Sequence, residues 1–308
     1  MKILISDKVR EEGIQILEEN GFKITKDYDL SDEQLKEVIG EYDAIIVRSG
    51  TQLTAEVLEK AKNLKAIGRA GVGLDNIDLK KAKELEIKVF NTPKAPSISV
   101  AELTVGLILC LVRNISHADR TMHCGEWCKS DYLGHTVHGQ KLGLIGYGNI
   151  GQEVAKRCDC LGMKVGIYDK DPEVLEKAKE LGFTIYRYVD DLIKDVNVIS
   201  LHIPSTVETE NTINDKRLDL MSKDTVIINT ARGNLIDEEA LVNALKNKKI
   251  GGAALDVYRE EPLTNMDLCD CKDNLILTPH IGSQTIETQK NTAMMIAEKL
   301  VNYLKSVD

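Results

Sequence analysis

The chain has 308 residues, of which 43% are hydrophobic and 29% charged, with a formal net charge of −9. This length suggests about two domains, and an acidic surface repels phosphate backbones, so nucleic acid is not an expected partner. The sequence holds no apolar run of roughly 18 residues, which argues against a membrane partner. The N-terminus MKILISDKVREEG becomes charged too soon for a signal peptide, so a cytoplasmic location is expected.

The chain contains seven cysteines, an odd count without the spacing of a small disulfide scaffold. We therefore expect reduced thiols. Five potential metal ligands fall within sixteen residues: His123, Cys124, Cys128, His135 and His138. Their spacing fits no standard zinc pattern, so we interpret them as ordinary surface and helix residues. No metal site is expected.

Strand and helix patterns alternate from the N-terminus onward. We predict strands at 2–6, 22–25, 43–49, 64–70 and 87–92, with helices near 8–20 and 32–41. The central strands have continuous rather than alternating apolar runs, which is typical of strands buried on both faces of a parallel sheet. Ser31 and Gln34 are spaced as a capping box at the start of the second helix.

The pattern changes after residue 92. TPKAPS at 92–97 holds two prolines and predicts a linker. Ser99 and Glu102 then form a second predicted capping box, before a long apolar helix over 101–113. Later strands are predicted at 141–146, 164–169, 183–186, 196–201, 225–229, 251–257 and 274–278, and a last helix at about 284–305. The long apolar helix is a candidate dimer element, although a helix buried within its own domain would have the same pattern.

A glycine-rich loop follows the strand at 141–146. In LGLIGYGNIGQEVAKR, Gly146 permits a tight turn, Gly148 lets backbone approach a pyrophosphate, and Gly151 lets helix and strand pack closely. Asp169 ends the next strand, where its carboxylate favours the ribose hydroxyls of NAD over the 2′-phosphate of NADP. Lys170, the next residue, carries a positive charge and keeps NADP open as an alternative. The alternative is a simple turn followed by a strand-end aspartate.

Three polar residues follow three later strands. Arg232 comes after the strand at 225–229, Glu261 after that at 251–257, and His280 after that at 274–278. Ligands of doubly wound sheets bind at the carboxyl ends of the strands. There a histidine can exchange the hydroxyl proton of an alcohol, a carboxylate can hold its ring, and an arginine can bind a substrate carboxylate. Each residue alone could be an ordinary loop residue, but together they predict hydride chemistry.

Four segments carry a resemblance to a known family. GYGNIG, NTARG, AALDVYREEP and TPHIGS, in this order, resemble the signature of the D-isomer-specific 2-hydroxyacid dehydrogenases. RSGTQLT, GRAGVGLDNIDL and NTPKAPSISVAELT are similar to members that act on a phosphorylated 2-hydroxy acid. The expected fold is two α/β domains with a cleft between them. A Rossmann-type, doubly wound parallel sheet over 98–282 would bind NAD, and a smaller flavodoxin-like domain over 1–97 and 283–308 would bind substrate.

The resemblance implies roles for individual residues. The catalytic residues would be Arg232, Glu261 and His280. Those expected to bind NAD are Val72, Gly146, Gly148, Asn149, Ile150, Gly151, Asp169, Ile203, Pro204, Thr230, Ala231, Asp256 and Ser283. Those expected to bind the substrate are Arg48, Ser49, Arg69, Gly71, Val72, Gly73 and Lys129. Lys129 would reach the substrate from a partner subunit, in a homodimer formed through the NAD-binding domain.

Some of these substrate assignments have ordinary alternatives. The glycine-rich GRAGVG follows a strand, so its amides can form an anion nest, although a simple turn would also fit. The expected phosphate ligands Arg48, Arg69 and Lys129 could equally be free surface cations.

Three departures from the family pattern matter. Asn149 stands where many members carry arginine or lysine, so one cationic contact to the pyrophosphate would be missing. Gly50 replaces a more usual alanine, which would leave the substrate loop looser. The chain leaves no room for the serine-binding regulatory domain of longer members, so no feedback through such a domain is expected. The implied reaction is NAD-dependent oxidation of a phosphorylated 2-hydroxy acid. Reduction of glyoxylate or hydroxypyruvate, and a non-enzymatic scaffold that senses NADH, stay open as alternatives.

Overall fold

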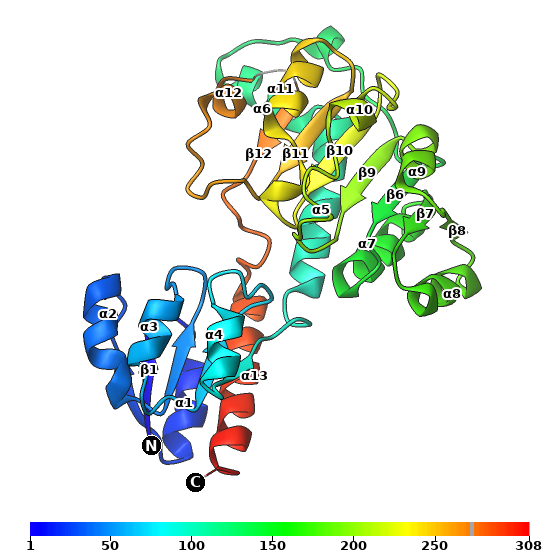
Figure 1. Ribbon diagram of the computed structural model, residues 1–308. Helices are drawn as coiled ribbons and strands as arrows, with labels where there is room; N and C mark the ends of the chain where they lie inside the picture. Colours follow the sequence, from blue (N-terminus) through cyan, green and yellow to red (C-terminus); the bar gives the residue numbers. More distant parts are fainter. Residues whose placement is uncertain (272–273, 308) are drawn as a thin grey trace. The chain divides into compact units, whose positions relative to one another are not determined.

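A computed structural model describes residues 1–271 and 274–307 (Figure 1). The chain forms two compact units, Met1–Pro96 together with the C-terminal segment from Ser283, and Ser97–Gly282. The domains expected from the sequence also included residues 272, 273 and 308, which lie outside the described residues. Each unit is a parallel sheet with helices on both faces, which confirms the predicted α/β class.

The first unit is built on five parallel strands in the order β2-β1-β3-β4-β5. These are β1 (Lys2–Ile5), β2 (Lys23–Lys26), β3 (Ala44–Val47), β4 (Ala66–Arg69) and β5 (Lys88–Phe90). The order is that of flavodoxin-like folds, as predicted. All four residues of β3 are buried, because helices cover the sheet on both sides.

The helices of this unit divide between the two faces. They are α1 (Glu11–Glu19), α2 (Asp32–Val38), η1 (Ile39–Glu41), α3 (Ala55–Lys60), α4 (Leu79–Glu84) and α13 (Ile286–Leu304). Side chains of α2, α3 and α4 fill one core cluster, and those of α1 and α13 fill the other. The capping box of α2 is confirmed: the Ser31 hydroxyl accepts from the Gln34 amide at 3.3 Å, and the Gln34 side chain accepts from the Ser31 amide at 3.0 Å.

The second unit is a seven-stranded parallel sheet in the order β12-β11-β10-β9-β6-β7-β8. Its strands are β6 (Lys141–Ile145), β7 (Lys164–Tyr168), β8 (Thr184–Ile185), β9 (Val198–Leu201), β10 (Val226–Asn229), β11 (Gly252–Leu255) and β12 (Leu275–Leu277). The chain winds outward from β6 in one direction and then from β9 in the other, which is the Rossmann arrangement that the sequence predicted. The ligand-binding crevice of such a sheet lies at the carboxyl ends of β6 and β9, where the winding reverses.

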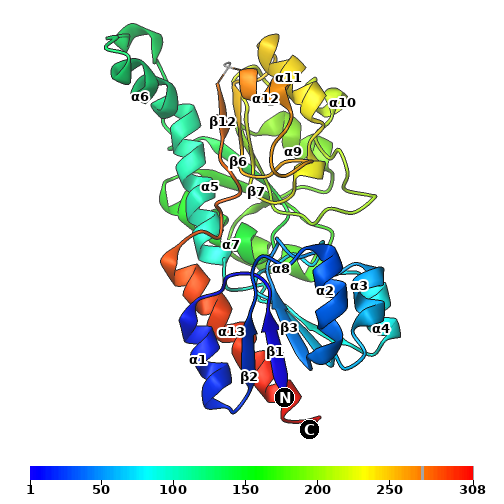
Figure 2. The ribbon, with the colours of Figure 1, turned by 90° about the vertical axis from the view of Figure 1, so that its left-hand side faces the viewer.

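Helices also cover both faces of this sheet. They are α5 (Ser97–Val112), α6 (Ile115–His123), η2 (Lys129–Asp131), α7 (Asn149–Cys160), α8 (Pro172–Glu180), α9 (Val189–Asp195), α10 (Asp215–Leu218), η3 (Gly233–Leu235), α11 (Glu238–Lys246) and α12 (Met266–Asp270). Side chains of α5, α7 and α8 pack on one face, and those of α9 to α12 on the other. Figure 2 shows α6 standing out from the rest of this unit at the end of α5.

The predicted second capping box is wrong. Helix α5 begins at Ser97, so Ser99 lies inside the first turn instead of before it. Pro96 directly precedes the helix, and its fixed φ suits an entry three residues earlier than the Ser99 capping box predicted. Among the described residues, no single helix is long and apolar enough to cross a membrane. Helices α5 and α6 meet those criteria only together, as a pair bent by 67°.

Candidate active site

The glycine loop after β6 has the geometry that a dinucleotide requires. Gly146 has φ +102°, and a β-carbon there would lie 2.4 Å from the His202 carbonyl oxygen. A β-carbon at Gly151 would lie 2.4 Å from the Gly146 oxygen, so the helix packs directly on the turn. At Gly148 nothing lies within 4 Å, which leaves its backbone open. Helix α7 begins next, at Asn149, and directs its N-terminal amides toward this opening.

Asp169 stands beside this loop at the end of β7. Its Oδ2 accepts from the Tyr147 amide at 2.6 Å, and its Oδ1 accepts from the Asp171 amide at 3.0 Å. The carboxylate is therefore held in place by backbone on both sides. On the other side of β6, Ile203 and Pro204 follow β9, with Ile203 partly buried and Pro204 exposed. These positions border the predicted adenosine side of the crevice.

Arg232 follows β10 in a turn closed by a side chain that the sequence did not single out. Asn229 is buried, its amide nitrogen donates to the Arg232 carbonyl at 2.8 Å, and its oxygen accepts from the Ala231 amide at 3.1 Å. A β-carbon at Gly233 would lie 1.9 Å from the Tyr258 carbonyl carbon. The glycine after Arg232 thus lets the exit of β10 pack against the exit of β11, which carries Glu261.

Glu261 and His280 are in direct contact. Their Oε2 and Nδ1 atoms lie 2.6 Å apart, and Glu261 Oε1 also accepts from the Tyr258 amide at 3.1 Å. Burial by itself would raise the pKa of Glu261. The hydrogen bonds from His280 and Tyr258, with the positive charge of Arg232, instead hold this pKa below its ordinary value. The three residues expected to be catalytic therefore interact electrostatically at one edge of the sheet.

The backbone that carries His280 is strained and firmly held. His280 has φ +52°, in the left-handed region that costs most residues energy. Asp256, which is 1% exposed, accepts from the Thr278 hydroxyl at 2.6 Å and from the amides of Ile281 and Gly282 at 2.8 and 2.9 Å. The buried carboxylate thus fixes the chain on both sides of the histidine.

Two further residues of this unit were predicted to bind ligands, Thr230 the cofactor and Lys129 the substrate. Thr230 is buried, and its hydroxyl lies 2.9 Å from that of Thr104 on α5. Lys129 is exposed on η2, in the segment beyond α6. Near it, Trp127 is 79% exposed and Leu133 is 92% exposed. No described group of three or more His, Cys, Asp or Glu side chains could hold a metal ion.

The first unit places its predicted substrate residues after β3 and β4. Arg48 and Ser49 follow β3 in a loop that two side chains hold. Asp7 Oδ2 accepts from the amides of Arg48 and Thr51 at 2.6 and 3.1 Å. Asn76 donates to the carbonyls of the same two residues at 2.8 and 2.7 Å. Burial lowers the pKa of the Arg48 guanidinium, against the opposing charge of Asp7.

The loop after β4 is packed beneath an arginine. The Arg69 guanidinium covers Gly71, where a β-carbon would come within 1.4 Å of its Nη1. The Gly71 amide donates to the Arg69 carbonyl at 2.9 Å, and the Val72 carbonyl accepts from Asn91 at 2.7 Å. Among the described residues, the amides of Val72 and Gly73 donate to no backbone carbonyl. Ser283, also expected at the cofactor, accepts at its carbonyl from Gln289 at 2.9 Å.

Sequence reasoning missed several residues that support these groups. Asp7, Asn76 and Asn229 act through loops, and no local motif marks them. His202 follows β9, and its Nε2 lies 2.8 Å from the Ser200 hydroxyl. Burial lowers the pKa of His202 to about 4, so a neutral imidazole stands beside the glycine loop. Its position directly after a strand was the one available signal.

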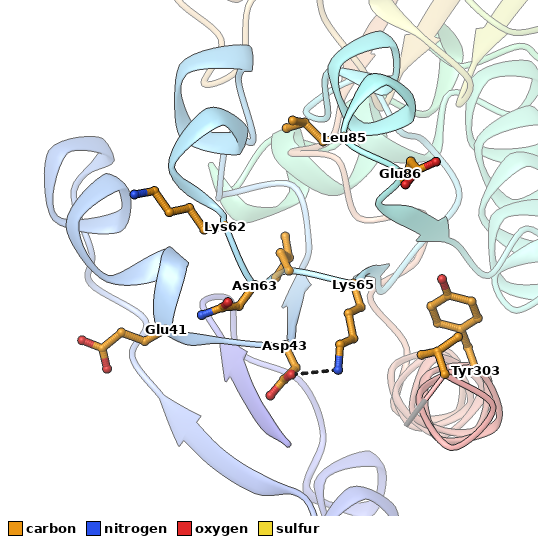
Figure 3. A pocket seen from close by; sticks show the side chains of 10 residues that line it. Glu41, Asp43, Lys62, Asn63, Lys65, Leu85, Glu86 and Tyr303 are labelled. Carbon is orange, nitrogen blue, oxygen red and sulfur yellow. Dashed lines mark ion pairs between the residues drawn. The ribbon is translucent and has the colours of Figure 1, made fainter.

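A hollow of about 520 Å³ in the first unit is not part of these sites. Its lining includes Asp43 and Lys65, whose charged groups lie 3.2 Å apart (Figure 3). Asp43 precedes β3 and Lys65 precedes β4, so the hollow lies at the amino ends of the strands. Arg48 and Arg69 occupy the opposite edge.

Comparison with known proteins identifies the family. Residues 105–282 match the D-isomer specific 2-hydroxyacid dehydrogenase, NAD binding domain. D-3-phosphoglycerate dehydrogenase from Methanocaldococcus jannaschii is 45% identical over 99% of this chain, and the chain spans 58% of that protein's length. Hydroxypyruvate reductase from Thermotoga maritima is 41% identical over 98% of both chains. The TT0316 protein from Thermus thermophilus superposes with a TM-score of 0.91 at 33% identity, covering 99% of this chain and 97% of its own.

The chain therefore belongs to the D-isomer specific 2-hydroxyacid dehydrogenase family. Its second unit contains the family's NAD-binding domain, as the glycine loop and Asp169 predicted.

Proposed function

We propose that the protein oxidises 3-phospho-D-glycerate to 3-phosphohydroxypyruvate with NAD, the step that opens the phosphorylated route to L-serine. The observation that carries the dehydrogenase assignment is the 2.6 Å contact between His280 and Glu261, with Arg232 close enough to lower the Glu261 pKa. The choice of substrate is supported by the M. jannaschii relative and by two arginines of the first unit, Arg48 directly after β3 and Arg69 at the end of the neighbouring β4. We assign dinucleotide binding to Ser97–Gly282 and substrate recognition to the other unit.

The residues have distinct roles in this reaction. NAD, held by the glycine loop and Asp169, would supply the acceptor for the hydride that leaves C2 of the substrate. His280 takes the proton of the C2 hydroxyl at Nε2, since its Nδ1 faces Glu261. The Glu261 carboxylate orients the ring and stabilises its protonated form. Arg232 and the amides of Val72 and Gly73 bind the substrate carboxylate, and Arg48 and Arg69 bind the phosphate.

The site offers a matching cradle for the coenzyme. Gly148 leaves its backbone open to the pyrophosphate, and Gly146 and Gly151 let the turn and α7 pack closely. Asn149 and Ile150 lie in the first turn of α7, whose amides would face the pyrophosphate. Asp169 would bind the ribose. Asn149 supplies no positive charge, so the helix amides alone would hold the pyrophosphate at this position.

Hydroxypyruvate reduction is the second candidate. The T. maritima relative that matches this chain from end to end carries that name. A turnover assay with a panel of 2-hydroxy and 2-oxo acids separates the candidates, and an NADH-sensing scaffold would turn over none of them. Phosphoglycerate turnover well above that of glycerate supports our proposal, and hydroxypyruvate as the best substrate contradicts it.

The Arg48→Ala variant tests phosphate recognition directly. Loss of a charge-assisted contact of about 1.5–3 kcal/mol should lower kcat/KM for phosphoglycerate by about 10- to 100-fold and change that for hydroxypyruvate far less. Arg187→Ala is the control, because the Arg187 guanidinium lies over the Tyr188 ring, 5.4 Å from its centroid, beyond the edge strand β8. Equal losses of kcat/KM for both substrates would show that Arg48 does not bind the phosphate.

We also propose a homodimer formed through the second unit. Helix α6 and the segment after it stand out from this unit and expose Ile115, Met122, Trp127 and Leu133 (Figure 2). Exposed apolar clusters of this kind mark association surfaces. Trp127→Glu should shift the mass measured by light scattering from dimer to monomer. If the dimer places Lys129 beside the partner's substrate, Lys129→Ala should also raise KM for phosphoglycerate. A monomeric wild-type protein would contradict the proposal.

A further inference from the structure

An ion pair crosses the crevice of the second unit next to the predicted ribose site. Lys170 Nζ and Glu208 Oε2 lie 2.6 Å apart, with side chains 64% and 75% exposed. Lys170 directly follows Asp169 at the end of β7, and Glu208 lies in the loop after β9. Because β6 lies between β7 and β9 in the sheet, the pair bridges the two loops that flank the glycine loop.

This location matters because the adenosine half of a dinucleotide lies between these loops in doubly wound folds. NAD and NADP differ only by the phosphate on the adenosine 2′-oxygen. Asp169 repels that phosphate, but the ammonium of Lys170 is the kind of group that attracts it. The two neighbouring residues therefore have opposite coenzyme preferences.

The surroundings of the two residues differ in rigidity. Two backbone amides fix the Asp169 carboxylate, at 2.6 and 3.0 Å. Lys170 has a long flexible side chain, and its polar contact is with Glu208. That contact raises the pKa of Lys170 and lowers the pKa of Glu208, so both groups are charged at neutral pH. The charge that Lys170 could offer a 2′-phosphate is thus already neutralised.

We infer that Glu208 is a coenzyme-specificity residue, which holds the protein to NAD by pairing with Lys170 across the adenosine crevice. A 2′-phosphate entering there meets the fixed carboxylate of Asp169 and a second carboxylate at Glu208. It must also displace Glu208 before it can reach Lys170. This inference rests on the coenzyme part of the proposed function and is independent of the substrate.

The test measures dissociation constants of NADH and NADPH by fluorescence titration, without turnover. Glu208→Gln keeps the size of the side chain and removes its charge. It should bind NADPH about three- to tenfold more tightly than wild type and NADH within about twofold of wild type, the size expected for one exposed charge. The gain should shrink as salt rises, since exposed charges are screened. Adding Lys170→Gln to Glu208→Gln should abolish it.

Asp219→Asn is the matched control. Asp219 pairs with Lys249 at 2.6 Å in the same unit, and it follows α10, away from the crevice. The Asp219→Asn variant removes the same negative charge as Glu208→Gln and should leave the ratio of the NADPH and NADH dissociation constants unchanged. The inference is overturned if Glu208→Gln behaves like Asp219→Asn, if its gain persists without Lys170, or if the wild type binds neither dinucleotide. A wild type that binds NADH but turns over no hydroxy acid refutes the proposed reaction. The titrations would still test the role of Glu208, because they measure binding and not turnover.

Discussion

The Nδ1 atom of His280 lies 2.6 Å from Oε2 of Glu261, although the two residues are 19 positions apart in the chain. They follow β12 and β11, which are neighbours in the sheet. The contact directs one ring nitrogen to the carboxylate and leaves Nε2 for a substrate. The carboxylate thereby fixes the orientation of the ring, and Nε2 is the atom that can take a substrate proton.

The first prediction concerns His280. Its replacement by alanine should lower kcat by about 10²–10⁴-fold, because the group that exchanges the substrate proton is lost. The dissociation constant of NADH should change little, since none of the glycine-loop contacts involves this side chain. Stopped-flow turnover and fluorescence titration measure the two quantities. His123→Ala, at an exposed position of α6, is the control, and unimpaired turnover by His280→Ala would refute the assignment.

The second prediction follows from the lowered pKa of Glu261. A carboxyl whose pKa is lower in the folded than in the unfolded protein stabilises the fold above its ordinary pKa of about 4.3, and this contribution is lost as pH falls through the folded value. The wild type should therefore be more stable than Glu261→Gln from about pH 5 to 8, by a small amount because the pair is partly exposed. The difference should shrink below about pH 4. Urea unfolding at each pH measures the difference in unfolding free energy between the two proteins. A difference that grows as the pH falls would contradict the lowered pKa of Glu261.

Much of this arrangement could be predicted because it is encoded locally. Continuous apolar runs locate the strands, and the rule that parallel strands share a carboxyl edge places Arg232, Glu261 and His280 at one edge from the sequence alone. Their catalytic roles stay a prediction. Asn229 and Asp7 could not be found in this way, because each acts on a loop through side-chain geometry that no spacing reveals. The start of α5 was missed because Pro96 and Ser99 gave competing signals for a helix entry.

The third prediction tests whether Asp256 positions His280. Asp256→Asn replaces one accepting oxygen with an NH₂ group that faces a donor, so it should destabilise the protein by about 1–3 kcal/mol. It should also lower kcat at saturating coenzyme, because the strained backbone at His280 is no longer held. Asp237→Ala removes the N-cap of α11, where the side chain accepts from the Ala240 amide at 3.1 Å, and should cost about 1 kcal/mol without lowering kcat. Equal effects of the two variants on kcat would show that Asp256 contributes to stability only and does not position His280.

The fourth prediction concerns Gly50, which we expected to loosen the substrate loop. A β-carbon at Gly50 would lie 2.6 Å from Asp7 Oδ1, while Oδ2 of the same carboxylate holds the amides of Arg48 and Thr51. The glycine therefore permits a close approach that fixes the loop. Gly50→Ala should force the carboxylate or the loop to move, at a cost of about 1–3 kcal/mol. It should also raise KM for phosphoglycerate, since Arg48 is displaced.

A double-mutant cycle separates this mechanism from a general effect of alanine. In an Asp7→Ala background the carboxylate is gone, so Gly50→Ala should cost much less than in the wild type, and the two changes should be clearly non-additive. Gly106→Ala on α5 is the control, because nothing lies within 4 Å of the added β-carbon. In a helix this change should stabilise the protein by roughly 0.5–1 kcal/mol. Additive costs at positions 7 and 50 would mean that the contact between them does not hold the substrate loop.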